Sequence, residues 1–153
     1  MQTAYSHALD ALSRRARSTV ELQRWLKERE HDPAEIELAI ERLTASGLLD
    51  DARYAMSFAR SRLLDRKLSK RRVLGELSRR GVARGVAAEA VNAVMEEEGI
   101  DEEAGVALVA ARKYRSLAKL DPQTAYRRLV GFLARRGYVG DVVRRAVSRL
   151  IKA

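Results

Sequence analysis

The 153-residue sequence contains no cysteine, and it is also poor in proline, glycine and aromatic residues. Without cysteine the chain forms neither a disulfide nor a thiolate metal site, and nothing in it suggests secretion. Two prolines, nine glycines and 5% aromatic residues argue against an all-β fold, which uses turn-forming and aromatic residues freely. A hydrophobic fraction of 46% suffices for a packed core and argues against disorder throughout. We therefore expect a soluble, all-α protein of the cytoplasm.

The sequence also lacks a long hydrophobic run. Its longest stretch without a charged side chain extends from Met1 to Leu9 and includes the polar residues Ser6 and His7. A membrane-spanning helix needs about 20 mostly apolar residues, so none is expected. The chain does not open with a basic segment followed by an apolar one, and this argues against a signal peptide.

Sequence motifs of common enzymes are absent as well. The chain has neither the Gly-x-x-x-x-Gly-Lys phosphate loop nor the Gly-x-Gly-x-x-Gly dinucleotide motif. Its two histidines, His7 and His31, lie far apart in the sequence and form no metal-ligand pattern. Ser6, His7 and Asp10 resemble a nucleophile set on paper, but adjacent residues on a helix do not face each other. We therefore predict that the protein is not an enzyme and needs no cofactor and no metal.

The charged residues are present in large number and are unevenly distributed. The net charge is +9, with 30 Lys or Arg against 21 Asp or Glu. Residues 1–50 carry seven basic and nine acidic side chains, residues 51–99 carry eleven and seven, and residues 100–153 carry twelve and five. The net charge thus rises from −2 through +4 to +7 along the chain. This asymmetry favours a polyanionic partner or an acidic protein surface. The alternative is an arginine-rich composition that only keeps the protein soluble.

Helix start and stop signals divide the chain into nine short helices. Ser18 and Glu21 form a capping box, in which the hydroxyl and the carboxylate each bind a backbone N–H at the helix start. Two Asp-Pro pairs, Asp32-Pro33 and Asp121-Pro122, place a cap before a proline at the first helical position. Gly81 and Gly137 follow apolar helical patterns and predict helix ends.

The apolar positions of these helices repeat three times. The first column is Leu26, which recurs 51 residues later as Leu77 and a further 56 residues later as Leu133. The other columns are Ile36, Ala87 and Val143; Ala39, Ala90 and Ala146; Ile40, Val91 and Val147; Leu43, Val94 and Leu150; and the arginines Arg29, Arg80 and Arg136. We therefore predict three tandem three-helix repeats, residues 1–48, 49–98 and 99–153, stacked into an elongated, curved body.

Basic side chains on three of these helices are candidates for contact with the partner. On the helix from residue 70, Arg72 and Arg79 share a flank with Glu76. This flank is alternatively a solvated helix face that holds a weak ion pair. On the last helix, Arg145, Arg149 and Lys152 share a flank that no acidic residue of that helix interrupts. The candidate contact residues are Lys70, Arg71, Arg72, Arg79, Arg135, Arg144, Arg145, Arg149 and Lys152.

The recurring arginine favours a structural role, because it falls near three helix C-termini. There a guanidinium can bind terminal carbonyls while its stem covers apolar surface. Arg135, beside Arg136, points away from this column and is the better contact candidate. Trp25 is expected in the core.

Four motifs in order along the chain resemble the RecX family. They are Ser18-x-x-Glu21-Leu22, Gly47-Leu48-Leu49-Asp50-Asp51-x-Arg53-Tyr54-Ala55, Glu76-Leu77-x-Arg79-Arg80-Gly81-Val82 and Phe132-Leu133-Ala134-Arg135-Arg136-Gly137-Tyr138. The resemblance implies a modulator of RecA recombinase built from tandem three-helix repeats. It also implies a monomer that binds in the groove of the RecA–single-stranded DNA filament, contacting protein and DNA phosphates. Such binding restrains filament growth, ATPase, strand exchange and coprotease activity, and so regulates recombinational DNA repair and the SOS response.

The chain departs from the family pattern in two places. Lys67-Leu68-Ser69-Lys70 stands where the family has a basic stretch with glycine. Tyr138 replaces a phenylalanine, and Val139-Gly140 replaces a polar residue. Because Tyr138 retains the aromatic ring, we expect unchanged packing and a more flexible loop before the last helix.

Two other functions remain open from the residues alone. Three-helix units resemble helix-turn-helix modules, so the protein is alternatively a direct, non-specific DNA-binding protein. The helix starts offer few Asn or Gln side chains, which argues against base readout. A passive helical adaptor is the third reading, but it does not explain the charge gradient.

Overall fold

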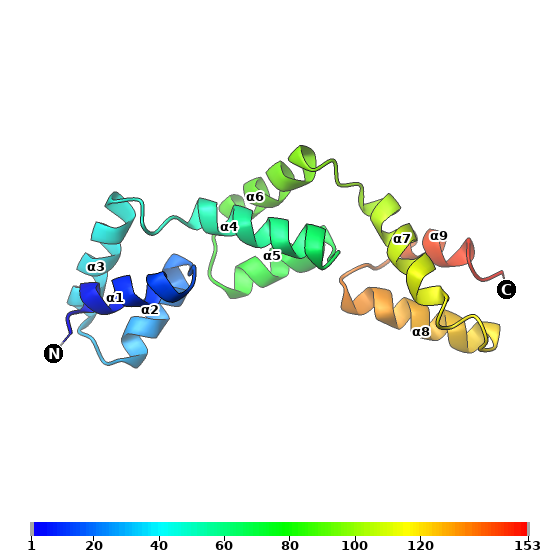
Figure 1. Ribbon diagram of the computed structural model, residues 1–153, viewed down its shortest axis with the longest axis horizontal. Coiled ribbons are helices and arrows are strands. Elements are labelled where there is room, and N and C mark those ends of the chain that lie inside the picture. Colours follow the sequence, from blue (N-terminus) through cyan, green and yellow to red (C-terminus); the bar gives the residue numbers. More distant parts are fainter. Residues whose placement is uncertain (1, 153) are drawn as a thin grey trace.

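The computed structural model describes residues 2–152, and within them the protein is entirely helical (Figure 1). The nine α-helices of this described part are α1 Ala4–Arg14, α2 Thr19–Glu28, α3 Pro33–Ala45, α4 Asp51–Arg60, α5 Lys70–Arg79, α6 Arg84–Glu97, α7 Glu102–Tyr114, α8 Pro122–Arg135 and α9 Asp141–Ser148. A π-helical segment, η1 Ser61–Asp65, continues α4. Among the described helices none is long and apolar enough to cross a membrane.

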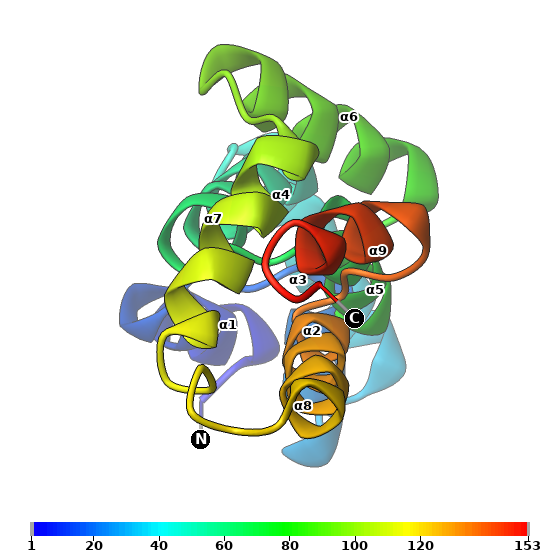
Figure 2. The ribbon, with the colours of Figure 1, turned by 90° about the vertical axis from the view of Figure 1, so that its right-hand side faces the viewer.

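The helices form three units that follow one another along an arch (Figure 1). Helices α1–α3 form the first unit, α4 to α6 with η1 the second, and α7–α9 the third, and each unit has its own apolar core. The two chain ends lie at opposite ends of the arch, and the view along it shows the units in succession (Figures 1 and 2). The expected elongated, curved stack of three-helix units is therefore confirmed.

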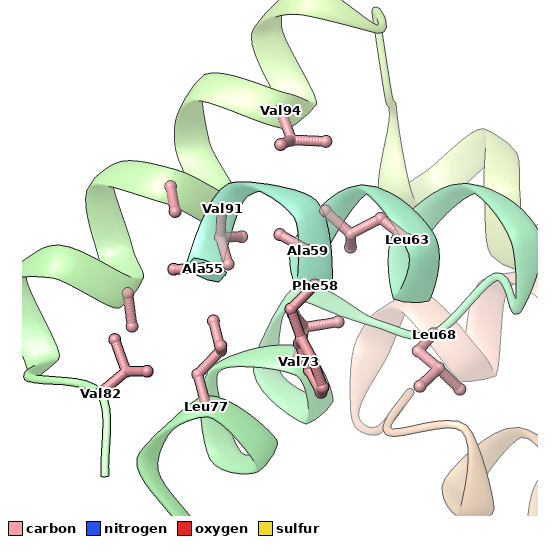
Figure 3. Packing of buried hydrophobic residues seen from close by; sticks show 12 residues of the cluster. Ala55, Phe58, Ala59, Leu63, Leu68, Val73, Leu77, Val82, Val91 and Val94 are labelled. Carbon is pink, nitrogen blue, oxygen red and sulfur yellow. The ribbon is translucent and has the colours of Figure 1, made fainter. Parts of the chain in front are cut away.

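The repeated apolar columns form these cores. Leu26, Leu77 and Leu133 are fully buried, and each is among the largest side chains at the centre of its unit. Figure 3 shows Leu77 with Val73 and Val91 in the second unit. The members of the other apolar columns are also buried, except for the half-buried Leu150. The sequence suggested that Trp25 lies inside the first core. In the structure it is half-buried at the edge of that core.

The predicted caps explain where the helices begin and end. Ser18 and Glu21 form both bonds of the capping box at the start of α2. Asp32 and Asp121 cap α3 and α8 with proline at the first helical position, as their sequences indicate. The backbone of Gly137 has a φ of +91° after α8, a left-handed conformation that glycine adopts without the steric penalty of a side chain.

The same set of contacts, which we call a joint, connects each unit to the next. The Ser18 hydroxyl, at the start of α2, donates to the Arg80 carbonyl at the end of α5 over 2.5 Å. At the second joint, the Ser69 hydroxyl at the start of α5 donates to the Gly137 carbonyl after α8 over 2.8 Å. Both serines are buried although they are polar, because the neighbouring unit covers them.

Two further contacts recur at both joints. The Thr19 N–H donates to the Asp51 carboxylate over 2.8 Å, and the Lys70 N–H donates to the Glu102 carboxylate over 2.5 Å. At each joint, the glycine that follows α5 or α8 packs tightly against the neighbouring unit. A Cβ at Gly137 would overlap the Ser69 hydroxyl and approach the Arg72 Cβ to 2.5 Å. These contacts fix the relative placement of neighbouring units, and so the curvature of the body.

Candidate polyanion-binding surfaces

An open cleft lies between the second and third units. It has a volume of about 730 Å³, and its floor is apolar, with side chains of Leu68, Val109 and Phe132. The remaining lining residues are charged: Asp65, Arg66, Lys67, Arg72, Arg112, Lys113, Arg135 and Arg136. We call this surface the basic cleft. It exists because the second joint brings the end of α8 against the segment that follows η1. Figure 3 shows Leu68 at the end of the second core that faces the third unit.

The charges of the basic cleft are almost all of one sign. Seven cationic side chains surround a single carboxylate, that of Asp65. Of these cations, only Arg72 forms an ion pair within residues 2–152, with Glu76 at 3.6 Å. The side chains of Arg66, Lys67, Arg112 and Arg135 are exposed. A concave surface lined by unpaired charges of one sign concentrates its potential and attracts anions.

Arg136 serves as a wall of the cleft rather than as a contact. Its Nη1 donates to the Arg66 carbonyl over 2.6 Å, and its guanidinium lies 4.7 Å from the centre of the Phe132 ring. The equivalent arginines behave similarly: Arg29 stacks on Trp25 at 3.5 Å and donates to its carbonyl, while Arg80 lies 4.7 Å from the Phe58 ring. The contacts confirm the structural role predicted for this arginine column. The Nε atom of Arg136 is buried without a hydrogen-bond partner among the described residues.

Tyr138 anchors the other side of this joint. Its ring is buried, as expected, and its hydroxyl donates to the Lys67 carbonyl over 2.9 Å. Burial raises the pKa of Tyr138 to about 12, and the negative charge of Glu102 adds to the rise while Arg136 opposes it. The phenol of the unfolded chain has a pKa of about 10.

We expect this difference to appear in alkaline solution. Because the folded state holds the Tyr138 proton more tightly, its contribution to stability is complete below pH of about 10 and is lost as the pH rises towards 12. In an absorbance titration of tyrosinate, Tyr138→Phe should remove the step at the highest pH. Tyr126→Phe, which removes an exposed ring, is the matched control and should retain that step. A curve for Tyr138→Phe that keeps the step at the highest pH and loses absorbance only at lower pH would contradict the assignment.

A second basic surface lies on α9. Arg144, Arg145 and Arg149 line a shallow hollow together with Asp141 and Ser148. The sequence predicted an uninterrupted cationic flank here, and the structure corrects this in two respects. Arg145 pairs with Glu103 of α7 at 2.7 Å, and Arg144 pairs with Asp141. In addition α9 ends at Ser148, so Lys152 is exposed beyond the helix and does not continue its flank.

The remaining sequence candidates do not join either surface. Arg71 and Arg79 are exposed on α5, and the Arg79 carbonyl accepts a hydrogen bond from Arg24 at 3.5 Å. Lys70 is half-buried, and its backbone serves the second joint. Only Arg72 and Arg135 of the predicted set meet in the basic cleft.

Sequence reasoning missed five of the seven cations that line the basic cleft, namely Arg66, Lys67, Arg112, Lys113 and Arg136. A signal was present, because Arg66-Lys67 and Arg112-Lys113 are adjacent basic pairs at the ends of predicted helices. Their convergence depends on the joint between two units, which no local pattern reveals.

The two histidines, which are far apart in the sequence, lie together in the structure. His7 Nδ1 and His31 Nε2 are 2.7 Å apart, beside the Trp25 ring. They meet because the turn after α2 folds back onto α1. No group of three or more potential metal ligands occurs among the described residues.

Comparisons with known proteins agree with this architecture. Family models described as the first, second and third three-helix domains of RecX match residues 4–43, 50–91 and 101–147. A regulatory protein RecX of Amycolatopsis mediterranei is 38% identical over 84% of this chain and 72% of its own length. That of Halorhodospira halophila is 37% identical over 92% of this chain and 84% of its own length.

Solved structures have the same fold. The crystal structure of RecX from Lactobacillus salivarius superposes with a TM-score of 0.79, at 18% identity, over 96% of this chain and 94% of that one. A second crystal structure, of a regulatory protein RecX, gives a TM-score of 0.78 at 21% identity over 97% of this chain and 71% of that one.

Proposed function

This chain belongs to the RecX family of regulatory proteins, which is non-enzymatic, and we propose that it binds the RecA–single-stranded DNA filament and restrains RecA. Binding in the filament groove would limit filament growth, and with it ATP hydrolysis, strand exchange and coprotease activity. The protein would thereby regulate recombinational repair and the SOS response in the cytoplasm, acting as a monomer.

The observation that carries this proposal, beyond family membership, is the pairing of an arched body with a basic third unit. Three units in a row can lie along a groove and contact several subunits of a filament (Figure 1). The α9 surface lies in the third unit, which has the largest net positive charge, and the basic cleft lies between that unit and the second. A filament offers acidic protein surface and DNA phosphates, and positive potential speeds association with either.

Recovery of the protein on immobilised filaments tests this proposal. RecA is assembled on biotinylated oligo-dT with a slowly hydrolysed ATP analogue, and the protein is added to these beads. Beads that carry the DNA alone and RecA without DNA serve as controls. We expect strong recovery on filaments, weaker recovery on DNA alone, and loss of both as salt rises. Equal recovery on filaments and on naked DNA would support the direct DNA-binding alternative instead, and no recovery on filaments would contradict the proposal.

A further inference from the structure

We propose that the basic cleft binds the phosphodiester backbone of a single-stranded nucleic acid. The proposal deepens the proposed function by assigning one contact to the nucleic-acid strand. It rests on that function only for its biological setting, because binding to an isolated strand can be measured without RecA.

The charge of the cleft is the first observation behind this proposal. Arginines elsewhere in the protein often pair with carboxylates, as Arg62 does with Glu76 at 3.3 Å and Arg60 with Glu97 at 3.1 Å. The basic cleft instead gathers seven cations from three places in the chain, six of which form no ion pair within residues 2–152. Their mutual repulsion opposes folding, and a bound polyanion removes that repulsion.

The placement of these side chains is the second observation. Arg66, Lys67, Arg112 and Arg135 are exposed, so their charged groups are available to a ligand. Their backbone is nevertheless held in place. The Arg66 carbonyl accepts from Arg136, the Lys67 carbonyl accepts from Tyr138, and the Arg135 carbonyl accepts from Arg72. The joint therefore presents exposed cationic side chains from a fixed backbone, and a backbone that is already ordered loses little entropy on binding.

The chemistry of the cleft favours phosphodiester over acidic protein. A nucleic-acid strand carries one negative charge per nucleotide and no cation of its own, which matches a lining with seven cations and one carboxylate. Arg66, Arg112 and Arg135 are exposed and form no ion pair among the described residues, and arginine is the side chain best suited to bind phosphate oxygens with two parallel hydrogen bonds. The apolar floor of Leu68, Val109 and Phe132 suits the sugar and base portions between phosphates.

The size of the cleft favours a single strand. A volume of about 730 Å³ lies in the range of pockets for small molecules. It admits part of one extended strand, and only the unpaired bases of a single strand are free to contact the apolar side chains of the cleft.

Fluorescence anisotropy with a labelled twenty-nucleotide oligo-dT tests the proposal on the full-length protein. The cleft variant carries Arg66→Glu, Arg112→Glu and Arg135→Glu, whose side chains are exposed and form no ion pair among the described residues. The hydrogen bonds of Arg66 and Arg135 described above use backbone carbonyls, so they survive the substitutions. The matched control carries Lys27→Glu, Arg84→Glu and Lys119→Glu, three exposed cations outside the cleft, and has the same net charge. Circular dichroism confirms that both variants remain helical.

We expect the cleft variant to bind oligo-dT about tenfold more weakly or worse, and the control within about threefold of the wild type. The logarithm of the wild-type binding constant should fall linearly with the logarithm of the salt concentration. Losing three phosphate contacts should reduce the steepness of that line by about 2, since each contributes about 0.7 on a single strand. Oligo-rU of the same length should bind similarly, because backbone recognition does not require deoxyribose.

Three results would overturn the proposal. The first is wild-type protein that does not bind oligo-dT even at low salt, and the second is an equal loss in the cleft variant and the control. The third is competition by poly-glutamate as effective as that by unlabelled oligo-dT, which would identify the cleft as a site for acidic protein. RecA is absent from all of these measurements, so a failure here leaves filament binding to be decided by the bead experiment.

Protection of lysines provides a second readout that does not depend on substitutions. Lys67 and Lys113 line the cleft, whereas Lys27 and Lys119 lie outside it. Mild acetylation followed by mass spectrometry should show that oligo-dT protects Lys67 and Lys113 and leaves Lys27 and Lys119 reactive. Uniform protection of all four lysines would place the strand elsewhere or in no fixed position, and so contradict the proposal.

Discussion

Gly137→Ala is expected to lower the free energy of unfolding by about 2–5 kcal/mol, because it destabilises the second joint in two ways. The residue has a φ of +91°, and a left-handed backbone costs a non-glycine residue about 1–2 kcal/mol. The new Cβ would also overlap the Ser69 hydroxyl and lie 2.5 Å from the Arg72 Cβ, and overpacking of this kind costs about 1–3 kcal/mol. Urea denaturation followed by circular dichroism measures the change.

Gly47→Ala is the matched control for this substitution. Gly47 also follows a helix and has a φ of +78°, but no atom lies within 4 Å of the position its Cβ would take. We therefore expect the control to lose only the backbone contribution of about 1–2 kcal/mol. Equal losses for the two variants would show that the joint is not packed as tightly as described.

Reversing two charges of the α9 surface together with that of Lys152 beyond it is expected to weaken binding to the RecA filament by about ten- to a hundredfold. The variant carries Arg144→Glu, Arg149→Glu and Lys152→Glu, all of them exposed. Arg145 is left unchanged because it pairs with Glu103 of α7, and its reversal would set two carboxylates against each other between packed helices. Arg144 pairs only with Asp141 on its own helix, where both side chains are exposed, so its reversal does not disturb the packing of α9. Individual exposed ion pairs contribute about 0–1 kcal/mol, so three lost contacts amount to at most about 3 kcal/mol. Each reversed charge also repels the acidic surface or the phosphates of the filament, and the two effects together account for a loss of one to two powers of ten.

Titration of filament-coated beads at several salt concentrations measures this effect. The variant with Lys27→Glu, Arg84→Glu and Lys119→Glu is again the control, because it changes the net charge equally. We expect the control to bind nearly as well as the wild type and the α9 variant to lose much of its salt dependence. If the α9 variant instead binds like the control, the contact surface lies elsewhere, and Arg71 and Arg79 of α5 become the next residues to reverse.

Much of the fold could be predicted from the sequence because its determinants are local. The Ser18 cap, the Asp-Pro starts and the glycines after helices act within one turn, and the apolar columns repeat at fixed offsets. These features define the helices, and their recurrence defines the three units.

The surfaces could be predicted only in part, because they depend on contacts between distant residues. Arg145 and Glu103 are 42 residues apart, and the bond from Arg136 to the Arg66 carbonyl spans 70 residues. The position of a side chain on its own helix indicates whether it is exposed, but not which charges of another unit approach it. The joints also escaped prediction, although one of the two serines that form them, Ser18, was identified as a cap. A cap whose hydroxyl also donates to another unit looks the same in the sequence as an ordinary cap.

The central claim is that this protein restrains RecA, and the rate of single-stranded DNA-dependent ATP hydrolysis by RecA tests it most directly. RecA is assembled on circular single-stranded DNA with ATP, and the protein is added at a small fraction of the RecA concentration. We predict a progressive fall in the rate of hydrolysis, which the α9 variant produces only weakly and the control variant produces fully. A rate that stays unchanged even when the protein equals RecA in concentration, while the protein remains folded, would contradict the account.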